Sequence, residues 1–127
     1  MKFSILKGLF AICRFNPTDE EPSWIDKKQF YTITRTSKEL SIVCIQDCLK
    51  GGLKAEKGWR ILELEGPIDF DLTGVIASIT QPLRDANIGV FVLSTFDTDY
   101  ILVKENLLNK AVESLSKTGF HFENEGN

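Results

Sequence analysis

The sequence contains few of the residues that build metal sites and catalytic triads. Its 127 residues include one histidine, His121, and three cysteines, Cys13, Cys44 and Cys48. A closed zinc site needs four nitrogen or sulfur ligands, and the pair Cys44 and Cys48 has no second cysteine pair to match it. The one histidine gives no convincing Ser–His–Asp or Cys–His set. We therefore expect no metal, no cofactor and no catalytic residues, and hence no enzymatic activity.

An excess of positive charge is also missing. Fifteen Lys and Arg residues against eighteen Asp and Glu residues give a net charge of −3, and no run of basic residues occurs. A partner held by bulk charge, such as nucleic acid or an anionic membrane, would require the opposite balance. We therefore expect neither partner.

Long hydrophobic runs are absent from the sequence. No run approaches the roughly 20 apolar residues that span a bilayer. Residues 3–6 follow a lysine, as in a signal peptide, but Lys7 and Arg14 interrupt the apolar stretch and no cleavage site follows. We expect a strand here instead. Without a leader, the odd number of cysteines favours reduced thiols and a cytoplasmic protein.

The C-terminal half carries clear periodic patterns. The chain is 43% hydrophobic and 26% charged, which is a globular composition. Alternating and helical spacings of apolar residues predict, in order, a strand at 59–65, a helix at 72–86, strands at 90–93 and 100–103, a helix at 107–115 and a short strand at 120–122. This order is typical of the ferredoxin-like βαββαβ fold, an α+β arrangement with an antiparallel sheet and helices on one face.

The N-terminal half repeats part of this pattern. At a shift of 60 positions, residues 31–34 fall on 91–94 and residues 40–43 fall on 100–103. Residues 22–25 leave room for only one helical turn, and the glycine-rich segment 47–58 reads as a connector. We therefore predict a tandem of ferredoxin-like units in which the first is truncated, with domains at 1–57 and 58–127.

Four segments, at 54–60, 65–70, 72–75 and 94–103, carry a family resemblance. They read KAEKGWR, EGPIDF, LTGV and STFDTDYILV. With them the chain resembles the small bacterial tandem ACT-domain proteins, whose ACT units are similar to those of aspartokinase regulatory regions and of the CASTOR arginine sensors. The resemblance implies amino-acid binding at an interface between ACT units. It also implies allosteric regulation of a separate partner enzyme rather than catalysis.

We expect the ligand at the loop 66–74 and the turn 94–99. The start of the predicted helix offers backbone N–H donors for a ligand carboxylate, and a glycine at position 74 permits close approach. Asp71 or Asp99 offers charge for the ammonium group, which mildly favours a cationic ligand such as arginine or lysine. The predicted ligand-binding residues are Asp69, Asp71, Leu72, Thr73, Gly74, Val75, Ser94, Thr95, Phe96 and Asp99.

Several of these residues can also be explained by a structural role, without a ligand. Asp69 and Asp71 suit the positive end of a helix dipole, with Thr73 near the N-cap, and Asp99 suits an exposed strand end. An aromatic residue at a turn, such as Phe96, packs on a neighbouring unit or lines a pocket more often than it faces water.

Two functions remain open at this stage. The first is a sensor that holds a free amino acid between its C-terminal ACT unit and a facing unit, in the same chain or in a second one. The alternative is a ligand-free protein–protein interaction module that modulates a separate enzyme. Exposed sheet edges favour a homodimer with two-fold symmetry in either case.

Overall fold

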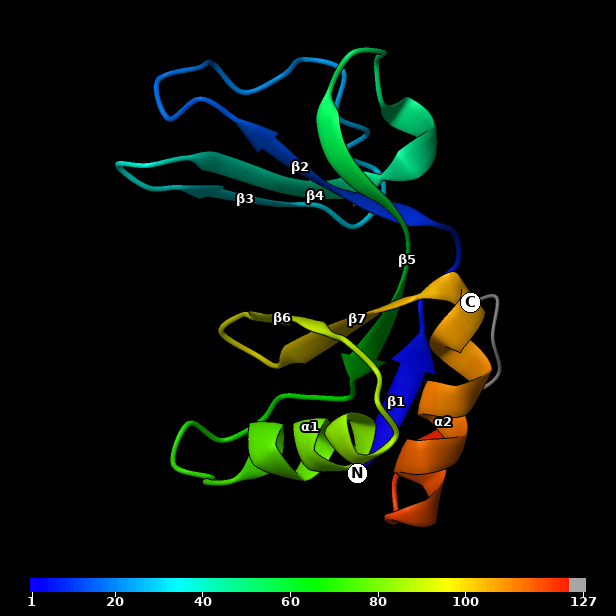
Figure 1. The fold of residues 1–127 in the computed structure, drawn as a ribbon. Helices are drawn as coiled ribbons and strands as arrows, with labels where there is room; N and C mark the ends of the chain where they lie inside the picture. The colour runs from blue at the N-terminus through cyan, green and yellow to red at the C-terminus, as the bar shows by residue number, and fades with distance from the viewer. Residues whose placement is uncertain (124–127) are drawn as a thin grey trace. The chain divides into compact units, whose positions relative to one another are not determined.

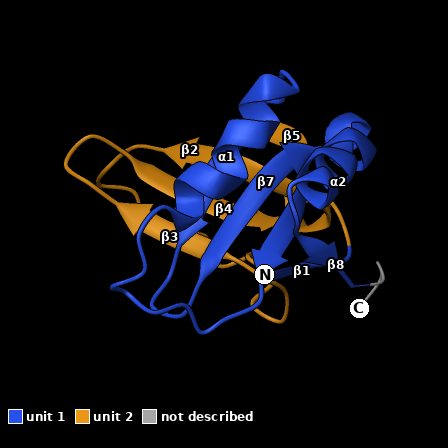
Figure 2. Ribbon diagram, turned by 90° about the horizontal axis from the view of Figure 1, so that it is seen from below, with its two compact units in different colours: residues 1–7, 60–127 blue, residues 8–59 orange. Residues whose placement is uncertain are grey.

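The computed structural model describes residues 1–123, and the chain divides into two compact units. Unit 1 contains residues 1–7 and 60–127, and unit 2 contains residues 8–59 (Figure 2). The last four residues of unit 1 lie outside the described part. No helix among residues 1–123 has the length and apolar character needed to cross a membrane.

Unit 1 has the predicted ferredoxin-like fold (Figure 1). Its elements are β1 (Lys2–Ile5), the second half of β5 (Lys54–Leu64), α1 (Val75–Asp85), β6 (Phe91–Ser94), β7 (Asp99–Lys104), the short 3-10 helix η2 (Glu105–Leu107), α2 (Leu108–Lys117) and β8 (His121–Phe122). The strands lie in the order β6-β7-β5-β1-β8. The elements follow the predicted order, but α1 begins at Val75, three residues after the predicted start, and α2 ends at Lys117, two residues after the predicted end.

The two helices of unit 1 cover one face of its sheet. Their buried residues fall three or four positions apart, as on one side of an amphipathic helix. They pack in a single core with alternate residues of β1, β5 and β7: Phe3, Ile5, Leu62, Leu64, Val75, Ile79, Leu83, Ile101, Val103, Leu108, Ala111 and Leu115. The expected arrangement of sheet and helices is thereby confirmed.

The first strand of the chain lies inside unit 1 and not in the N-terminal unit. β1 pairs antiparallel with β5, where Phe3 lies opposite Leu64, and parallel with β8. The fully buried ring of Phe3 lies 5.3 Å from the rings of both Phe120 and Phe122. The sequence predicted domains at 1–57 and 58–127, whereas the compact units are residues 8–59 and residues 1–7 with 60–127. Residues 1–7 belong to unit 1 because their apolar side chains complete its core.

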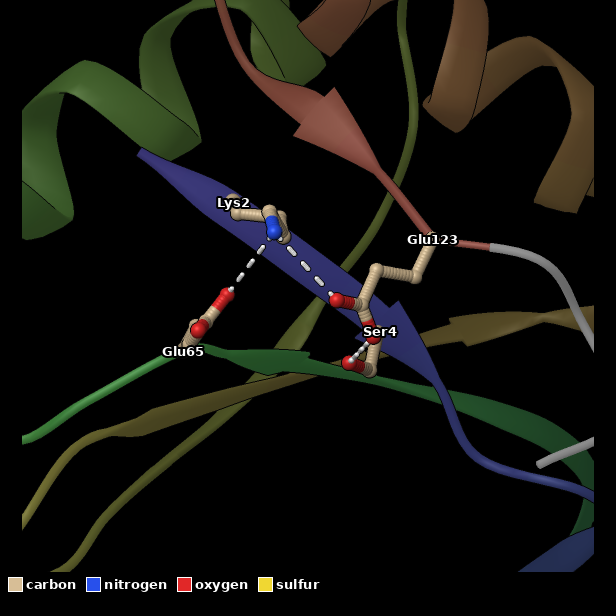
Figure 3. A network of polar contacts seen from close by, with 4 residues as sticks. All are labelled: Lys2, Ser4, Glu65 and Glu123. Carbon is tan, nitrogen blue, oxygen red and sulfur yellow. Dashed lines mark hydrogen bonds and ion pairs between the residues drawn. The ribbon is translucent and has the colours of Figure 1, made fainter.

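A polar network holds β1 between its neighbours (Figure 3). The Lys2 ammonium lies 3.6 Å from the Glu65 carboxylate and 3.3 Å from that of Glu123, and the Ser4 hydroxyl donates to Glu123 at 3.3 Å. The hydrogen bond with Glu123 and the charges of both carboxylates raise the pKa of Lys2. These contacts are exposed, so they set the position of β1 more than its stability.

Unit 2 has the same strand order without α-helices. It contains β2 (Phe10–Phe15), β3 (Thr32–Arg35), β4 (Leu40–Ile45), the 3-10 helix η1 (Gln46–Cys48) and the first half of β5, in the order β3-β4-β2-β5. Residues 16–31 form turns and irregular backbone where unit 1 has a helix, in keeping with the expectation that residues 22–25 leave room for no more than one helical turn. Ile25 is buried against the sheet from this loop, with Trp24 beside it. The prediction of a truncated repeat is confirmed.

The strand β5 begins five residues earlier than predicted. Residues 54–58, expected as part of a connector, form its first half, where Ala55 pairs with Cys13 of β2. Lys54 and Glu56 are exposed, so this half shows no apolar alternation in the sequence. The pairing with β2 then slips by one residue, and Gly58 there has a φ of +81°, which glycine adopts without strain.

The two units share one hairpin design. In the β3–β4 hairpin Arg35 pairs with Leu40, and in the β6–β7 hairpin Ser94 pairs with Asp99. Each four-residue loop begins with a threonine whose N–H donates to the carbonyl of the fourth residue, at 2.9 Å from Thr36 to Glu39 and 2.8 Å from Thr95 to Thr98. The repeat therefore has a shift of 59, one less than the sequence alignment at 60.

Candidate functional site

A cavity of about 470 Å³ opens in unit 1 beside the start of α1. Its lining residues come from the loop after β5, the first turn of α1 and the β6–β7 hairpin: Ile68, Asp69, Phe70, Leu72, Gly74, Val75, Ile76, Ala77, Ser94, Thr95, Phe96, Asp97, Thr98 and Asp99. Eight of the ten predicted residues are among them. Asp71 and Thr73 are exposed and are not part of the lining.

The structure adds six lining residues to the prediction. Phe70 and Asp97 stood inside the motifs EGPIDF and STFDTDYILV, so the sequence already contained a signal for them. Ile68 and Thr98 hold the two loops together. Ile76 and Ala77 line the cavity because they lie in the first turn of α1. This helix begins at Val75, whereas the spacing of the apolar residues predicted a start at residue 72.

Two hydrogen bonds fix the loop after β5 against the β6–β7 hairpin. The Ile68 N–H donates to the Asp97 carbonyl at 2.7 Å, and the buried Thr98 hydroxyl donates to the Leu64 carbonyl at 2.6 Å. A Cβ at Gly66 would lie 2.8 Å from the same Asp97 carbonyl oxygen. Glycine is required there because the two backbones approach so closely.

The β6–β7 hairpin presents its tip to the cavity. The Thr95 N–H and hydroxyl both donate to the Thr98 carbonyl, at 2.8 and 3.2 Å. At the base of the hairpin the Ser94 hydroxyl donates to Asp99 Oδ1 at 2.5 Å. These bonds hold the tip residues Phe96 and Asp97 in a defined loop. In the matching hairpin of unit 2 the tip residues are Ser37 and Lys38, so the aromatic and acidic tip belongs to unit 1.

Asp69 shapes the loop that leads to α1. Its carboxylate accepts a hydrogen bond from the Asp71 N–H at 2.8 Å, and its carbonyl accepts one from the Leu72 N–H at 3.0 Å. These two bonds close a turn, so Asp69 has a structural role in this loop. They also engage the Leu72 amide that we expected to face a ligand.

The start of α1 differs from the predicted one. The N-cap residue is Gly74, with a left-handed φ of +78°, and no side chain caps the helix. Thr73 is therefore not the N-cap. The first helical hydrogen bond runs from the Ser78 N–H to the Gly74 carbonyl at 2.9 Å. The amides of residues 75–77 precede that bond, so they are the donors that this helix start offers to an anion.

Exposed apolar side chains lie at the mouth of the cavity. Phe70 and Phe96 are 72% and 80% exposed, and their rings meet edge to face with centroids 5.0 Å apart. Leu72 is 50% exposed. Phe96 belongs to the lining of the cavity, and most of its surface is nevertheless exposed. Large apolar side chains are costly to leave in water.

The charge of the cavity is negative. Asp69, Asp97 and Asp99 belong to its lining, and the lining includes no lysine, arginine or histidine. Beside it, the Tyr100 hydroxyl donates to Glu63 at 3.3 Å; partial burial, together with the nearby carboxylates of Glu63 and Asp97, raises the pKa of Tyr100. No group of three or more potential ligands within residues 1–123 is arranged to hold a metal ion.

Comparison with known proteins relates this chain to a family. The model of the ACT domain matches residues 54–117, and a second family model, for an N-terminal domain, matches residues 8–50. The human protein named "Cytosolic arginine sensor for mTORC1 subunit 1" is 37% identical over 60 residues, which are 46% of this chain. The match covers 18% of that relative's length.

Solved structures extend the likeness to the whole chain. A protein of Agobacterium tumefaciens is 38% identical, with a TM-score of 0.92 over 99% of this chain and 93% of that one. The ligand-free regulatory subunit of aspartate kinase from Thermus thermophilus shares the fold, with a TM-score of 0.61 at 9% identity over 90% of this chain and 94% of that one. The domain match, these relatives and the fold of unit 1 lead to one conclusion: this chain belongs to the ACT-domain family.

Proposed function

We propose that this chain is a regulatory sensor that binds a free amino acid in the cavity of unit 1. The observation that carries the proposal is the joint lining of that cavity by the first turn of α1 and by three aspartates, Asp69, Asp97 and Asp99. A free amino acid has an anionic carboxylate and a cationic ammonium group, so it requires donors and acceptors in one site. The amides of residues 75–77 would receive the carboxylate, and the aspartates would receive the ammonium.

We infer that the ligand has a cationic side chain, with arginine as the first choice. Asp69, Asp97 and Asp99 provide more negative charge than one ammonium group needs. The exposed rings of Phe70 and Phe96 suit the methylene stem and the planar guanidinium group, which stacks favourably on aromatic faces. The name of the human relative, an arginine sensor, supports the same ligand class.

We further propose that a second copy closes the cavity in a homodimer. The exposed apolar mouth formed by Phe70, Leu72 and Phe96 would be covered in that arrangement. Within residues 1–123, the edge strands β3 and β6 each pair with a single strand, which leaves backbone groups for pairing between copies. A cationic ligand would neutralise the aspartates and so favour the contact. The dimer would in turn regulate a separate enzyme in the cytoplasm. The strength of this regulation is set by the difference between the ligand's affinities for the monomer and for the dimer.

A thermal-shift screen against the twenty amino acids tests the proposal. At about 100 times its Kd, arginine should stabilise the fold by about 2.7 kcal/mol. In a chain of this size that raises Tm by roughly 5–15 °C. Asp97→Asn should reduce the shift, whereas Asp47→Asn, on the exposed η1 of unit 2, should leave it unchanged.

A flat screen on folded protein would contradict ligand binding. The exposed apolar mouth would then favour the second candidate function, a ligand-free interaction module that modulates a separate enzyme. Size-exclusion chromatography with light scattering, with and without arginine, tests the homodimer separately. A monomer under both conditions would overturn that part.

A further inference from the structure

The three aspartates of the cavity differ in their hydrogen bonds. One oxygen of the Asp69 carboxylate accepts a bond from the Asp71 N–H at 2.8 Å. One oxygen of the Asp99 carboxylate accepts a bond from the Ser94 hydroxyl at 2.5 Å. The Asp97 carboxylate accepts no hydrogen bond from any donor in the described part of the chain. Asp97 therefore has both of its oxygens available to a ligand, whereas the other two aspartates each have one oxygen engaged.

The backbone at Asp97 is nevertheless held in place. Its carbonyl accepts a hydrogen bond from the Ile68 N–H at 2.7 Å, and Gly66 lies directly against the same carbonyl oxygen. Binding costs less conformational entropy when the chain that carries the binding group is already fixed. Asp97 therefore offers an unengaged carboxylate from a preorganised position at the junction of the two loops that line the cavity.

The β3–β4 hairpin anchors the matching residue in the same way. Lys38 is the third residue of its four-residue loop, as Asp97 is in the β6–β7 hairpin, and the Lys38 carbonyl accepts a hydrogen bond from the Arg14 guanidinium at 3.0 Å. The anchored carbonyl is thus common to both hairpins, but the side chains that follow from it have opposite charges. The hairpin design accounts for the fixed backbone, and it does not account for a carboxylate at position 97.

The number of available oxygens decides which cation a carboxylate holds best. A guanidinium group is planar and donates two parallel N–H bonds to the two oxygens of one carboxylate. An ammonium group is a compact charge that can bond to single oxygens from several directions. The Asp97 carboxylate therefore fits a guanidinium group, and the remaining oxygens of Asp69 and Asp99 fit an ammonium group.

We propose that Asp97 makes the cavity specific for arginine over lysine and over neutral analogues. The inference rests on the proposed amino-acid site and assigns the roles within it. Asp97 binds the guanidinium group through both oxygens, and Asp69 and Asp99 bind the α-ammonium group. Phe96 precedes Asp97 in the hairpin, and its ring meets that of Phe70 with centroids 5.0 Å apart. An aromatic surface on which a guanidinium group can stack is therefore next to Asp97 in the chain.

Calorimetric titration of the full chain with arginine, lysine and citrulline tests the proposal. Citrulline has the length of arginine but an uncharged urea group. The unaltered chain should bind arginine at least about tenfold more tightly than either of the other two. Asp97→Asn keeps the size of the side chain and removes its charge. It should weaken arginine binding at least about tenfold and change citrulline binding by less than about twofold, so that the preference for arginine is lost.

Two further variants provide the controls. Asp99→Asn should weaken the binding of arginine, lysine and citrulline by similar factors, because the α-ammonium group is common to all three. Asp85→Asn makes the same change of charge on the exposed last residue of α1, outside the cavity, and should leave all three affinities unchanged. Urea unfolding of each variant checks that the fold is intact.

The possible results separate this inference from the proposed function. If Asp97→Asn kept its preference for arginine, or weakened all three ligands equally, Asp97 would not be the specificity residue, although the amino-acid site would stand. Loss of the preference in Asp99→Asn alone would give the guanidinium group to Asp99 instead. If the folded, unaltered chain bound no amino acid, the proposed function would be wrong, and this inference with it.

Discussion

At the scale of single residues, two glycines shape the cavity for different physical reasons. Gly66 is needed because its backbone lies against the Asp97 carbonyl, where a Cβ would come within 2.8 Å. Gly74 is needed because its φ is +78°, a left-handed conformation that L side chains rarely adopt, although the space around it is open. The first constraint is packing between loops, and the second is the conformation of the chain where α1 begins.

Replacing Gly74 separates the stability of the fold from ligand binding. Gly74→Val should lower the free energy of unfolding by about 2 kcal/mol, because a branched side chain is strained in the left-handed region. It should also abolish the Tm shift caused by arginine, because the new side chain would enter the cavity.

Gly52 provides the matched control for this change. It has a φ of +79° and equally open surroundings, but it lies in a turn of unit 2. Gly52→Val should lower the free energy of unfolding in urea by a similar amount and keep the arginine shift. If the Gly74 variant retained its affinity for arginine, the start of α1 would not be the binding site.

The position of the cavity could be predicted from the sequence, but its details could not. The motifs around Asp69 and Phe96 indicated the two loops that line it. Whether Thr73 or Gly74 is the N-cap depends on a backbone angle that residue type alone does not specify, since threonine is the commoner N-cap. The bond from the Leu72 amide to Asp69 likewise depends on the tertiary path of the loop.

At the scale of elements, the strands of unit 1 were easier to predict than those of unit 2. Leu62 and Leu64 lie on either side of the polar Glu63 because one face of β5 is buried in the core of unit 1. The first half of β5 lies at the edge of unit 2, where Lys54 and Glu56 face water and leave no pattern to detect. The insertion of β1 is a long-range pairing, and local periodicity contains no information about it.

The contact between β7 and β5 predicts a dependence of stability on pH. Burial and the carboxylate of Glu63 raise the pKa of Tyr100 above its ordinary 10.0, so the folded chain holds this proton more tightly than the unfolded one. The stability from this difference is complete below pH 10 and is lost as the pH rises through the pKa of the folded state. Tyr100→Phe should reduce the fall of Tm above about pH 10. An unchanged alkaline profile in this variant would contradict the assignment.

At the scale of the whole molecule, the two units share one strand order but differ in their hairpin tips and in their α-helices. Both have the hairpin with a threonine-initiated loop, but unit 1 carries Phe96 and Asp97 at its tip where unit 2 carries Ser37 and Lys38. Among the described residues, only unit 1 has α-helices, and the start of α1 belongs to the lining of the cavity. The duplication could be detected in the sequence because both units have the same spacing between the strands of the hairpin. The absence of a long helix in unit 2 could be predicted because the segment between its first two strands is too short to contain one.

The negative charge of the chain and its cavity predicts that ligand binding depends on salt. Raising the ionic strength from about 0.03 M to about 0.3 M shortens the Debye length roughly threefold. The affinity for arginine, measured by calorimetry, should fall by roughly threefold to tenfold, since part of its attraction to Asp69, Asp97 and Asp99 is screened. Citrulline, with an uncharged urea group in place of the guanidinium, should bind more weakly and lose less affinity with salt. Equal salt dependence for both would show that the aspartates do not contact the side-chain cation.

The place of β1 has a consequence for the synthesis of the protein. β1 is synthesised before its partners, which are residues 62–64 of β5 and residues 121–122 of β8. All of unit 2 is made before the first partner appears, and nearly all of unit 1 before the second. During this interval the apolar side chains of Phe3 and Ile5 have no core to enter. β1 is therefore among the last of the described strands to pair, although it precedes the others in the chain. Until then its exposed apolar side chains are a surface that cellular chaperones are suited to cover.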